Sequence, residues 1–237
     1  MRVVTFVVVA CLVLTASPAS AEWFADVFGG LSFTEKSDVT VHSPAGLGIF
    51  RDVEFDRALT YGGRAGRFFD GAPFVGLGVD GFKFSPRIGP QRVRVDGCVP
   101  SGGCGGGQGG TGVIDVDVTA ISLDLILRLP LLKTEKAPWG SLQPYIAGGA
   151  PLFLTTVTPR TTTQFRNHQD DTDFSFGYKV AGGLAFQVVS NLMIFSEYRL
   201  THTRSEVELR DAATLRHTPV RMDLDTHSVL VGLSARW

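Results

Sequence analysis

The last nine residues of the chain, Val229 to Trp237, alternate between apolar side chains and small or polar ones. Every second position counted back from the end is apolar: Trp237, Ala235, Leu233, Val231 and Val229. Between them and before them lie Arg236, Ser234, Gly232, Leu230 and Ser228, of which only Leu230 breaks the pattern. A period of two predicts a β-strand with one apolar and one polar face. The final aromatic ring favours the edge of a bilayer.

Seven earlier segments show similar alternation. They are Trp23–Phe33, Leu59–Phe69, Phe74–Phe84, Ile121–Leu129, Leu142–Leu154, Phe174–Gln187 and Leu192–His202. Each has about ten residues or slightly more, which is the length that a tilted strand needs to cross a bilayer. Pro144 and Pro151 are awkward in a strand because proline cannot donate to the ladder, so the faces of Leu142–Leu154 stay unassigned.

The connections between these segments alternate between long and short. The long ones are polar: 34–57, 85–112, 159–173 and 203–220. The short ones are the turns 70–73 and 190–191 and the link 132–141. Short periplasmic turns and long extracellular loops are typical of outer-membrane barrels. A secreted sandwich would also alternate, but it does not explain the loop rhythm.

We therefore predict one all-β domain, an eight-stranded antiparallel transmembrane β-barrel. Its closing strand, Val229–Trp237, should pair with Trp23–Phe33. An even number of strands puts the N- and C-termini on the same side, which we expect to be the periplasm. Closed barrels are the only β structures that span lipid, because every backbone group must find a partner.

The first 21 residues are a separate element. Arg2 supplies a positive start, Val3 to Leu14 form an apolar run, and Ala19-Ser20-Ala21 is an A-x-A cleavage site. This pattern predicts a secretory signal peptide, because twelve apolar residues are too few to span a membrane. Cys11 only loosely resembles a lipid-attachment site. We expect a cleaved signal peptide at 1–21 and a barrel domain at 22–237.

Charge and composition fit this picture. The chain carries 22 basic and 23 acidic side chains, and cleavage removes only Arg2, which leaves a net charge of −2. Such a balance gives no reason to expect a nucleic-acid partner. The hydrophobic content of 44%, with 28 Gly and 17 Phe, suits either an outer-membrane barrel or a secreted β-sandwich.

Residues 174–203, FSFGYKVAGGLAFQVVSNLMIFSEYRLTHT, resemble the penultimate hairpin of the small outer-membrane β-barrel proteins, the OmpA-type barrel superfamily. The glycine-rich strand, the short turn and Glu-Tyr-Arg carry the resemblance, and GGRAGRFF, LILRLPL and LQPYIAGGAP are similar to other strands of that family. The resemblance covers essentially the whole mature chain. It implies a location in the bacterial outer membrane, a monomer, and outer-membrane lipid and the barrel-assembly machinery as partners.

Nine charged residues fall on the polar faces of the predicted strands. Five are basic and four are acidic: Arg64, Arg128, Lys179, Arg199 and Arg236, with Asp26, Asp80, Asp124 and Glu197. The interior of an eight-stranded barrel is just wide enough for side chains to fill. Nearly balanced charges should pair there, because an unpaired charge away from water is costly. We interpret the set as a salt-bridged interior network, with a narrow or gated polar path as the alternative.

Two cysteines remain after cleavage, Cys98 and Cys104, within the glycine-rich stretch VDGCVPSGGCGGGQGG. An even number in an exported chain predicts a disulfide that closes a small loop. Metal binding is the weaker reading, since no His or carboxylate stands beside them at ligand spacing. The stretch has no strand pattern, so we expect it to be mobile or held only by the disulfide.

Catalytic chemistry has one candidate. His202 and His227 lie on adjacent strands near one rim, with Ser205 and Glu206 close by, and a Ser-His-acid set at this level could modify lipids. The alternative is that both are ordinary interface residues. His42, His168 and His217 are scattered over loops. We predict no catalytic, cofactor-binding or metal-binding residues.

The predicted function is therefore non-enzymatic, a structural or surface-interaction role in the outer membrane. The loops at 160–173 and around the cysteines are candidates for contacts with a ligand that the sequence does not identify. A porin-like channel or transporter for small molecules is one alternative, and a lipid-modifying enzyme is another.

In the resembling family, a last strand that ends on an aromatic residue is the assembly signal. The usual residue is Phe, so Trp237 departs mildly from the pattern. Deletion of Trp237 should impair insertion into the outer membrane more than folding in detergent. Quantitative blotting of outer-membrane fractions checks this, and normal levels of the truncated protein contradict it.

Overall fold

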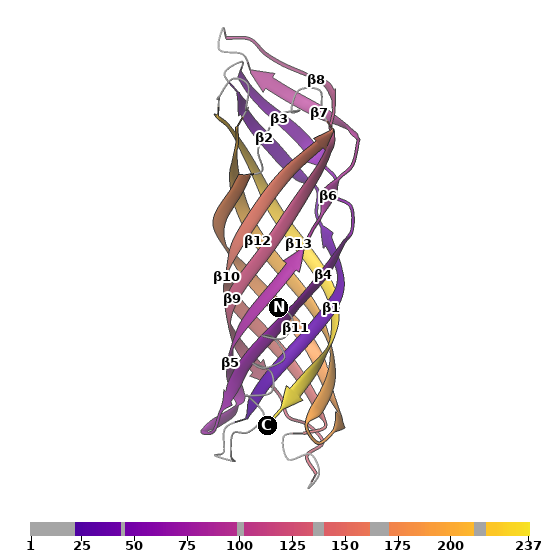
Figure 1. Ribbon diagram of the computed structural model, residues 1–237, viewed down its shortest axis with the longest axis vertical. Helices are drawn as coiled ribbons and strands as arrows, with labels where there is room; N and C mark the ends of the chain where they lie inside the picture. Colours follow the sequence, from indigo (N-terminus) through magenta and orange to yellow (C-terminus); the bar gives the residue numbers. More distant parts are fainter. Residues whose placement is uncertain (1–21, 44–45, 99–101, 135–139, 162–170, 211–216) are drawn as a thin grey trace, which may run out of the picture.

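The computed structural model describes residues 22–43, 46–98, 102–134, 140–161, 171–210 and 217–237. The predicted signal peptide at 1–21 lies outside this part of the chain. Figure 1 shows a long barrel of tilted strands with a smaller sheet at one end. No helix in the described part is long and apolar enough to cross a membrane.

Eight strands form the barrel. They are β1 (Trp23–Thr34), β4 (Ala58–Phe69), β5 (Ala72–Phe84), β9 (Val113–Arg128), β10 (Leu142–Thr161), β11 (Asp171–Val189), β12 (Leu192–Arg210) and β13 (His217–Arg236). Each pairs antiparallel with the next, and β1 pairs with β13 from Phe24↔Arg236 to Thr34↔Thr226. The predicted eight-stranded barrel and its closing pair are confirmed.

The two ends of the barrel differ. At the turn end, the Trp23 N–H donates to the Trp237 carbonyl at 2.8 Å, and the turns 70–71 and 190–191 and the described parts of 129–141 lie at this same end. At the other end, the loop end, lie the last residues of β10 and β12, the first residues of β11 and β13, and the described parts of 35–57 and 85–112. Both ends of the barrel sequence therefore lie at the turn end. That the turn end faces the periplasm stays a prediction.

An apolar belt surrounds the barrel. Leu123 on β9 and Val231 on β13 are each 63% exposed, and the alternate residues of every barrel strand face the same way. Exposed aromatic rings stand toward both rims: Trp23, Phe69, Phe74 and Phe186 near the turn end, and Phe33, Tyr61, Phe176, Tyr178 and Tyr198 toward the loop end. A belt between two aromatic girdles is the surface that lipid requires of a barrel.

Two segments expected to be loops contain strands instead. They are β2 (Ser37–Ser43), β3 (Gly46–Val53), β6 (Arg87–Ile88), β7 (Arg92–Cys98) and β8 (Cys104–Gly110). β2 pairs with β13, and the sheet continues in the order β2, β3, β7, β8. We call these four strands the display sheet. The prediction that the glycine-rich stretch is mobile or held only by the disulfide was wrong. Strand pairing needs only backbone N–H and C=O groups, and glycines have no side chains whose alternation could reveal a strand.

The last four barrel strands are also longer than expected. β10 and β11 extend into the region 159–173, and β12 and β13 extend into 203–220. Their loop-end parts enclose buried apolar side chains, including Val157, Met222 and Leu224, which belong to the same cluster as Phe28 and Phe195 further along the barrel. Within β10, the ladder to β11 skips Ala150 and Pro151, as the missing proline N–H requires.

Val231 lies midway between Ala235 and His227 on the outer face of β13. Val231→Arg should lower the free energy of unfolding by about 2–4 kcal/mol, because a charge near the bilayer midplane loses its hydration. Val231→Leu, which keeps an apolar side chain, should change little. Urea unfolding in lipid vesicles measures both, and equal stability of the two variants would argue against a lipid-facing Val231.

Candidate functional site in the barrel interior

All nine charged residues expected in the interior lie on the inner face. Eight are at most 5% exposed, and the Arg236 side chain is 11% exposed near the turn end. The cause is the strand alternation, which aims every second side chain inward. Two groups form, one in the middle of the barrel and one at the turn end.

The first group begins with Asp26 on β1. The Arg64 guanidinium lies 2.9 Å from the Asp26 carboxylate and 3.1 Å from that of Glu197. Arg199 Nη2 is 2.7 Å from Glu197 Oε1, and the Tyr145 hydroxyl donates to Glu197 Oε2 at 2.8 Å. Glu197 is therefore held by two guanidinium groups and a phenol.

The same chain of contacts continues across the lumen. Arg199 Nη2 also lies 2.8 Å from Asp80 Oδ2. Lys179 Nζ is 2.7 Å from Asp80 and 2.6 Å from Asp124. Seven charged side chains from six strands, together with Tyr145 on β10, thus form one connected network. Arg199 is further sandwiched by Phe28 and Phe82, whose ring centres lie 4.7 and 4.8 Å from its guanidinium carbon.

The second group depends on Glu22, a residue that sequence reasoning missed. Its carboxylate accepts two hydrogen bonds from Arg128, one of them 2.8 Å long, and lies 3.3 Å from Arg236. Gln143 accepts a further bond from Arg128 at 3.2 Å. Glu22 precedes the first strand, so alternation could not place it. The predicted interior set has five basic and four acidic residues. This excess of one base was the available signal that a further acid was needed, and Glu22 supplies it.

The rest of the interior is filled. Toward the loop end, hydroxyl groups bond to one another, with Ser32 to Ser228 at 2.8 Å and Ser175 to Thr203 at 3.0 Å. An apolar core toward the loop end includes Phe84, Val118, Phe153 and Leu224, and Phe82, which also contacts Arg199, connects this core to the ion-pair network. A cavity of about 20 Å³ beside Asp26 and Tyr145 has room for roughly one water molecule.

The two cysteines lie where β7 ends and β8 begins. Cys98 and Cys104 are opposite one another in the ladder and form a disulfide. The bond therefore joins two paired strands, where the sequence suggested only a closed loop.

The histidines face outward. His202 Nδ1 is 2.6 Å from Asp225 and its ring stacks on Tyr178, while His227 lies between Tyr198 at 2.5 Å and Glu35 at 2.8 Å.

Ser205 and Glu206 do not join these histidines. Ser205 is buried on the inner face and donates to Asp173 at 2.9 Å, so it lies on the opposite face from His202. Glu206 pairs with Arg221 at 2.8 Å. His42 is exposed on β2, His168 lies outside the described residues, and His217 begins β13. The described residues contain no group of three His, Cys, Asp or Glu side chains that could hold a metal ion.

Glu197→Ala should lower the free energy of unfolding by about 3–5 kcal/mol, because it leaves Arg64 and Arg199 buried without their shared carboxylate. Glu197→Gln keeps the size and an acceptor oxygen, so its loss should be smaller. Thermal unfolding followed by circular dichroism in detergent measures both. A wild-type melting temperature for Glu197→Ala would show that the network is not needed for stability.

No protein-family model matches the chain, and no curated protein matches its sequence. Solved structures do match its fold. The outer-membrane protease OmpT from Escherichia coli has a TM-score of 0.52 at 10% identity, over 94% of this chain and 99% of that one. OprG from Pseudomonas aeruginosa (TM-score 0.49, 14% identity, 92% and 96% covered) and Neisserial surface protein A (0.48, 13%, 93% and 99%) are also similar. The closed ladder, the apolar belt and the likeness in fold to OmpT show that the chain has the fold of a transmembrane β-barrel, here with eight strands.

Proposed function

We propose that the protein is a closed, non-enzymatic barrel that anchors the display sheet in the outer membrane for contact with a surface partner. The filled interior is the observation that carries this proposal. Ion pairs, hydroxyl groups and an apolar core follow one another along the lumen, and the cavity beside Asp26 holds about 20 Å³. Outer-membrane lipid would contact the belt, the assembly machinery would read the last strand, and the barrel would act as a monomer.

Transport through the lumen would require both the ion-pair network and the apolar core to open. Glu197 and Arg199 are each at most 2% exposed, and separating them would leave both charges without a partner. The apolar layer, with Phe84 and Phe153, would also have to part and meet water. Neither step has a visible trigger in the described residues, so a fixed scaffold fits the interior better than a conduit.

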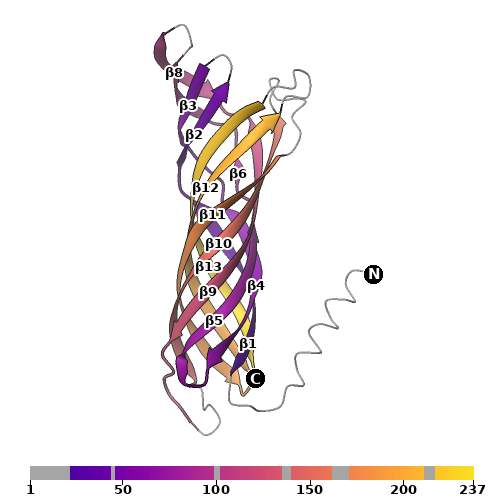
Figure 2. The same ribbon diagram turned by 90° about the vertical axis from the view of Figure 1, so that its left-hand side faces the viewer.

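The display sheet is rigid enough to act as a binding surface. Its inner face contributes Val53 and Val93, which pack with Ile88 in a small core of their own. Figure 2 shows β2, β3 and β8 standing beyond the ends of most barrel strands. The barrel fixes this sheet through the pairing of Val220 and Arg221 with β2.

The outer face of the display sheet is charged. Arg51 lies 2.5 Å from Asp38 and 3.2 Å from Asp96, and Lys36 pairs with Glu54 nearby at 2.6 Å. Charged, solvated faces of this kind suit polar recognition on a rigid scaffold.

The alternative of a lipid-modifying enzyme has less support. Ser205 and His202 lie on opposite faces of β12, so the serine cannot reach the histidine. The outward His227, with Tyr198 and Glu35, is explained by its place in the loop-end aromatic girdle, where rings with polar tips are favoured.

Planar-bilayer recording tests the closed barrel. The wild-type protein should give no steady, ion-selective current, because buried ion pairs and an apolar core occupy the lumen between the described strands. Glu197→Ala should give no large conductance either, since the apolar layer remains. The E197A variant must first show heat-modifiable migration on gels, as a check that it folds. A stable selective pore in the wild type would overturn the proposal in favour of transport.

A further inference from the structure

The display sheet ends in an open edge. β8 pairs with β7 on one side, and no described strand pairs with its other side. An edge strand exposes a row of unpaired N–H and C=O groups that can accept another strand. Proteins usually guard such edges with charged side chains, prolines, bulges or a covering segment.

The β8 edge carries none of these guards. Its sequence, Cys104 to Gly110, reads CGGGQGG, with no charged residue and no proline, and its register with β7 is unbroken. The only long side chain is that of Gln108. The strand is nonetheless held in place, because the disulfide fixes one end and the Thr111 N–H donates to the Gln91 carbonyl at 2.9 Å beyond the other end.

The fold does not require most of these glycines. A Cβ added at Gly105, Gly107 or Gly110 would meet no atom within 4 Å, and none of the three has a positive φ. Glycine in a strand costs conformational entropy and often marks a place where another backbone approaches closely. The bare strand therefore suits contact with a partner more than it suits packing within this chain.

The register identifies the free backbone groups. Thr111 and Gln91 form a hydrogen-bonded pair, and antiparallel pairs alternate between hydrogen-bonded and non-hydrogen-bonded. Gly110, Gln108, Gly106 and Cys104 are then the non-hydrogen-bonded positions, whose N–H and C=O groups point away from β7. The separation of 4.1 Å between the Cα atoms of Cys98 and Cys104 agrees, because non-hydrogen-bonded pairs lie closer together.

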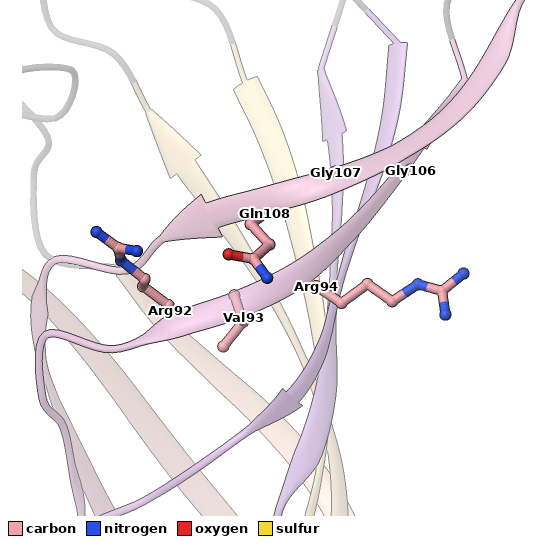
Figure 3. Close-up of a pocket in the computed structure, with 6 residues that line it drawn as sticks. All are labelled: Arg92, Val93, Arg94, Gly106, Gly107 and Gln108. Atoms are coloured by element: carbon pink, nitrogen blue, oxygen red, sulfur yellow. The ribbon is translucent and has the colours of Figure 1, made fainter.

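Arginines flank this edge on β7. Arg92 is opposite Gly110 and Arg94 is opposite Gln108, and both are exposed. Figure 3 shows the two long side chains leaving β7 in different directions, on either side of Gln108. With Val93, these residues line an open groove of about 520 Å³.

The carboxylates nearby do not neutralise both arginines. Asp96 is 3.1 Å from Arg94 and also accepts a bond from Arg51, and these hydrogen bonds, that of Arg51 first, lower the pKa of Asp96. Asp96 is thus ionised at neutral pH and engaged with those two groups. Arg92 has no carboxylate partner among the described residues, and Gly110 beside it leaves space for its side chain to reach across β8.

We propose that β8 is the docking strand for an extended, acidic segment of a partner polypeptide, which adds to the display sheet as a further strand. Backbone hydrogen bonds to Gly106, Gln108 and Gly110 would supply affinity, and carboxylates at alternate positions would meet Arg92 and Arg94. The proposal rests on the display function above. Binding and conductance are measured separately, so a failure of one is distinguishable from a failure of the other.

The test uses the full barrel in lipid nanodiscs and fluorescent peptides of alternating Glu and Val. The matched controls replace Glu by Lys, or carry N-methyl groups on alternate backbone amides. Fluorescence anisotropy should show the acidic peptide binding about tenfold or more tightly than the Lys peptide. The Glu side chains form charge-assisted contacts with the arginines of β7, whereas the Lys side chains are repelled by them. Equal binding of the Lys peptide overturns the acidic specificity, and equal binding of the methylated peptide overturns strand addition.

Two substitutions at one position isolate the backbone contribution. Gln108→Pro removes an outward N–H but no bond to β7, so the hairpin should persist, whereas Gln108→Thr keeps that N–H. The first should bind the acidic peptide about tenfold more weakly than the second. A non-reducing gel shift confirms that Cys98 and Cys104 remain bonded in both. Equal affinities would contradict the proposal.

Arg92→Glu isolates the charge contribution, and it should remove most of the preference for the acidic peptide over the Lys peptide. An unchanged preference would place the charge recognition elsewhere.

Sedimentation of the nanodisc-free protein in detergent tests whether the partner is a second copy of this chain. If Gln108→Pro converts a dimer into a monomer and no peptide binds, the edge pairs with itself and the proposal is wrong.

Discussion

The rest of the structure depends on the need to satisfy every backbone hydrogen bond within a bilayer. Hydrocarbon offers no partner for an exposed N–H or C=O group, so the sheet must close. The pairing of β1 with β13, from Phe24 to Thr34, achieves this closure. Closure with eight strands in turn sets a narrow lumen, and the narrow lumen makes the inward side chains touch.

A narrow lumen explains why the charged residues come as a balanced network. Arg64, Arg199 and Lys179 each have carboxylate partners within 3.1 Å, and all three are almost fully buried. Such pairs contribute specificity as much as stability, because a shifted register would leave charges unpaired. The apolar core near the loop end has the opposite character, and it lets the long strands β10 to β13 continue beyond the belt.

Closure protects the barrel edges but not those of the display sheet. β2 attaches to β13 through two paired residues, and the sheet then runs outward to β8, where it simply ends. Unpaired backbone N–H and C=O groups force a sheet to close in lipid. At the edge of the display sheet, water can solvate these groups, so the edge can stay open. The filled interior and the open edge therefore support the proposal that the barrel anchors the chain and the display sheet recognises a partner.

Alternation alone determined most of the barrel. Strands such as Ile121–Leu129 and Val229–Trp237 have side chains that differ on the two faces. The period of two therefore predicts the strand, the residues that face lipid, such as Val231, and the residues that face inward, such as Arg236. The nine interior charges could be placed for the same reason, whereas the cysteine pair was predicted from an even count in an exported chain. These features depend on local chemistry, which a sequence carries directly.

Other features became visible only in three dimensions. Glu22 belongs to no periodic segment, and it reaches Arg128 on β9 only because the closed barrel brings the two side chains together in its interior. β8 has almost no side chains, so its pairing depends on backbone hydrogen bonds with β7, which the sequence pattern does not reveal. Ser205 and His202 are three residues apart, and only the strand geometry places them on opposite faces. The sequence by itself determined which residues face lipid and which face inward, while the tertiary structure decided which inward residues meet and where the sheet is left open.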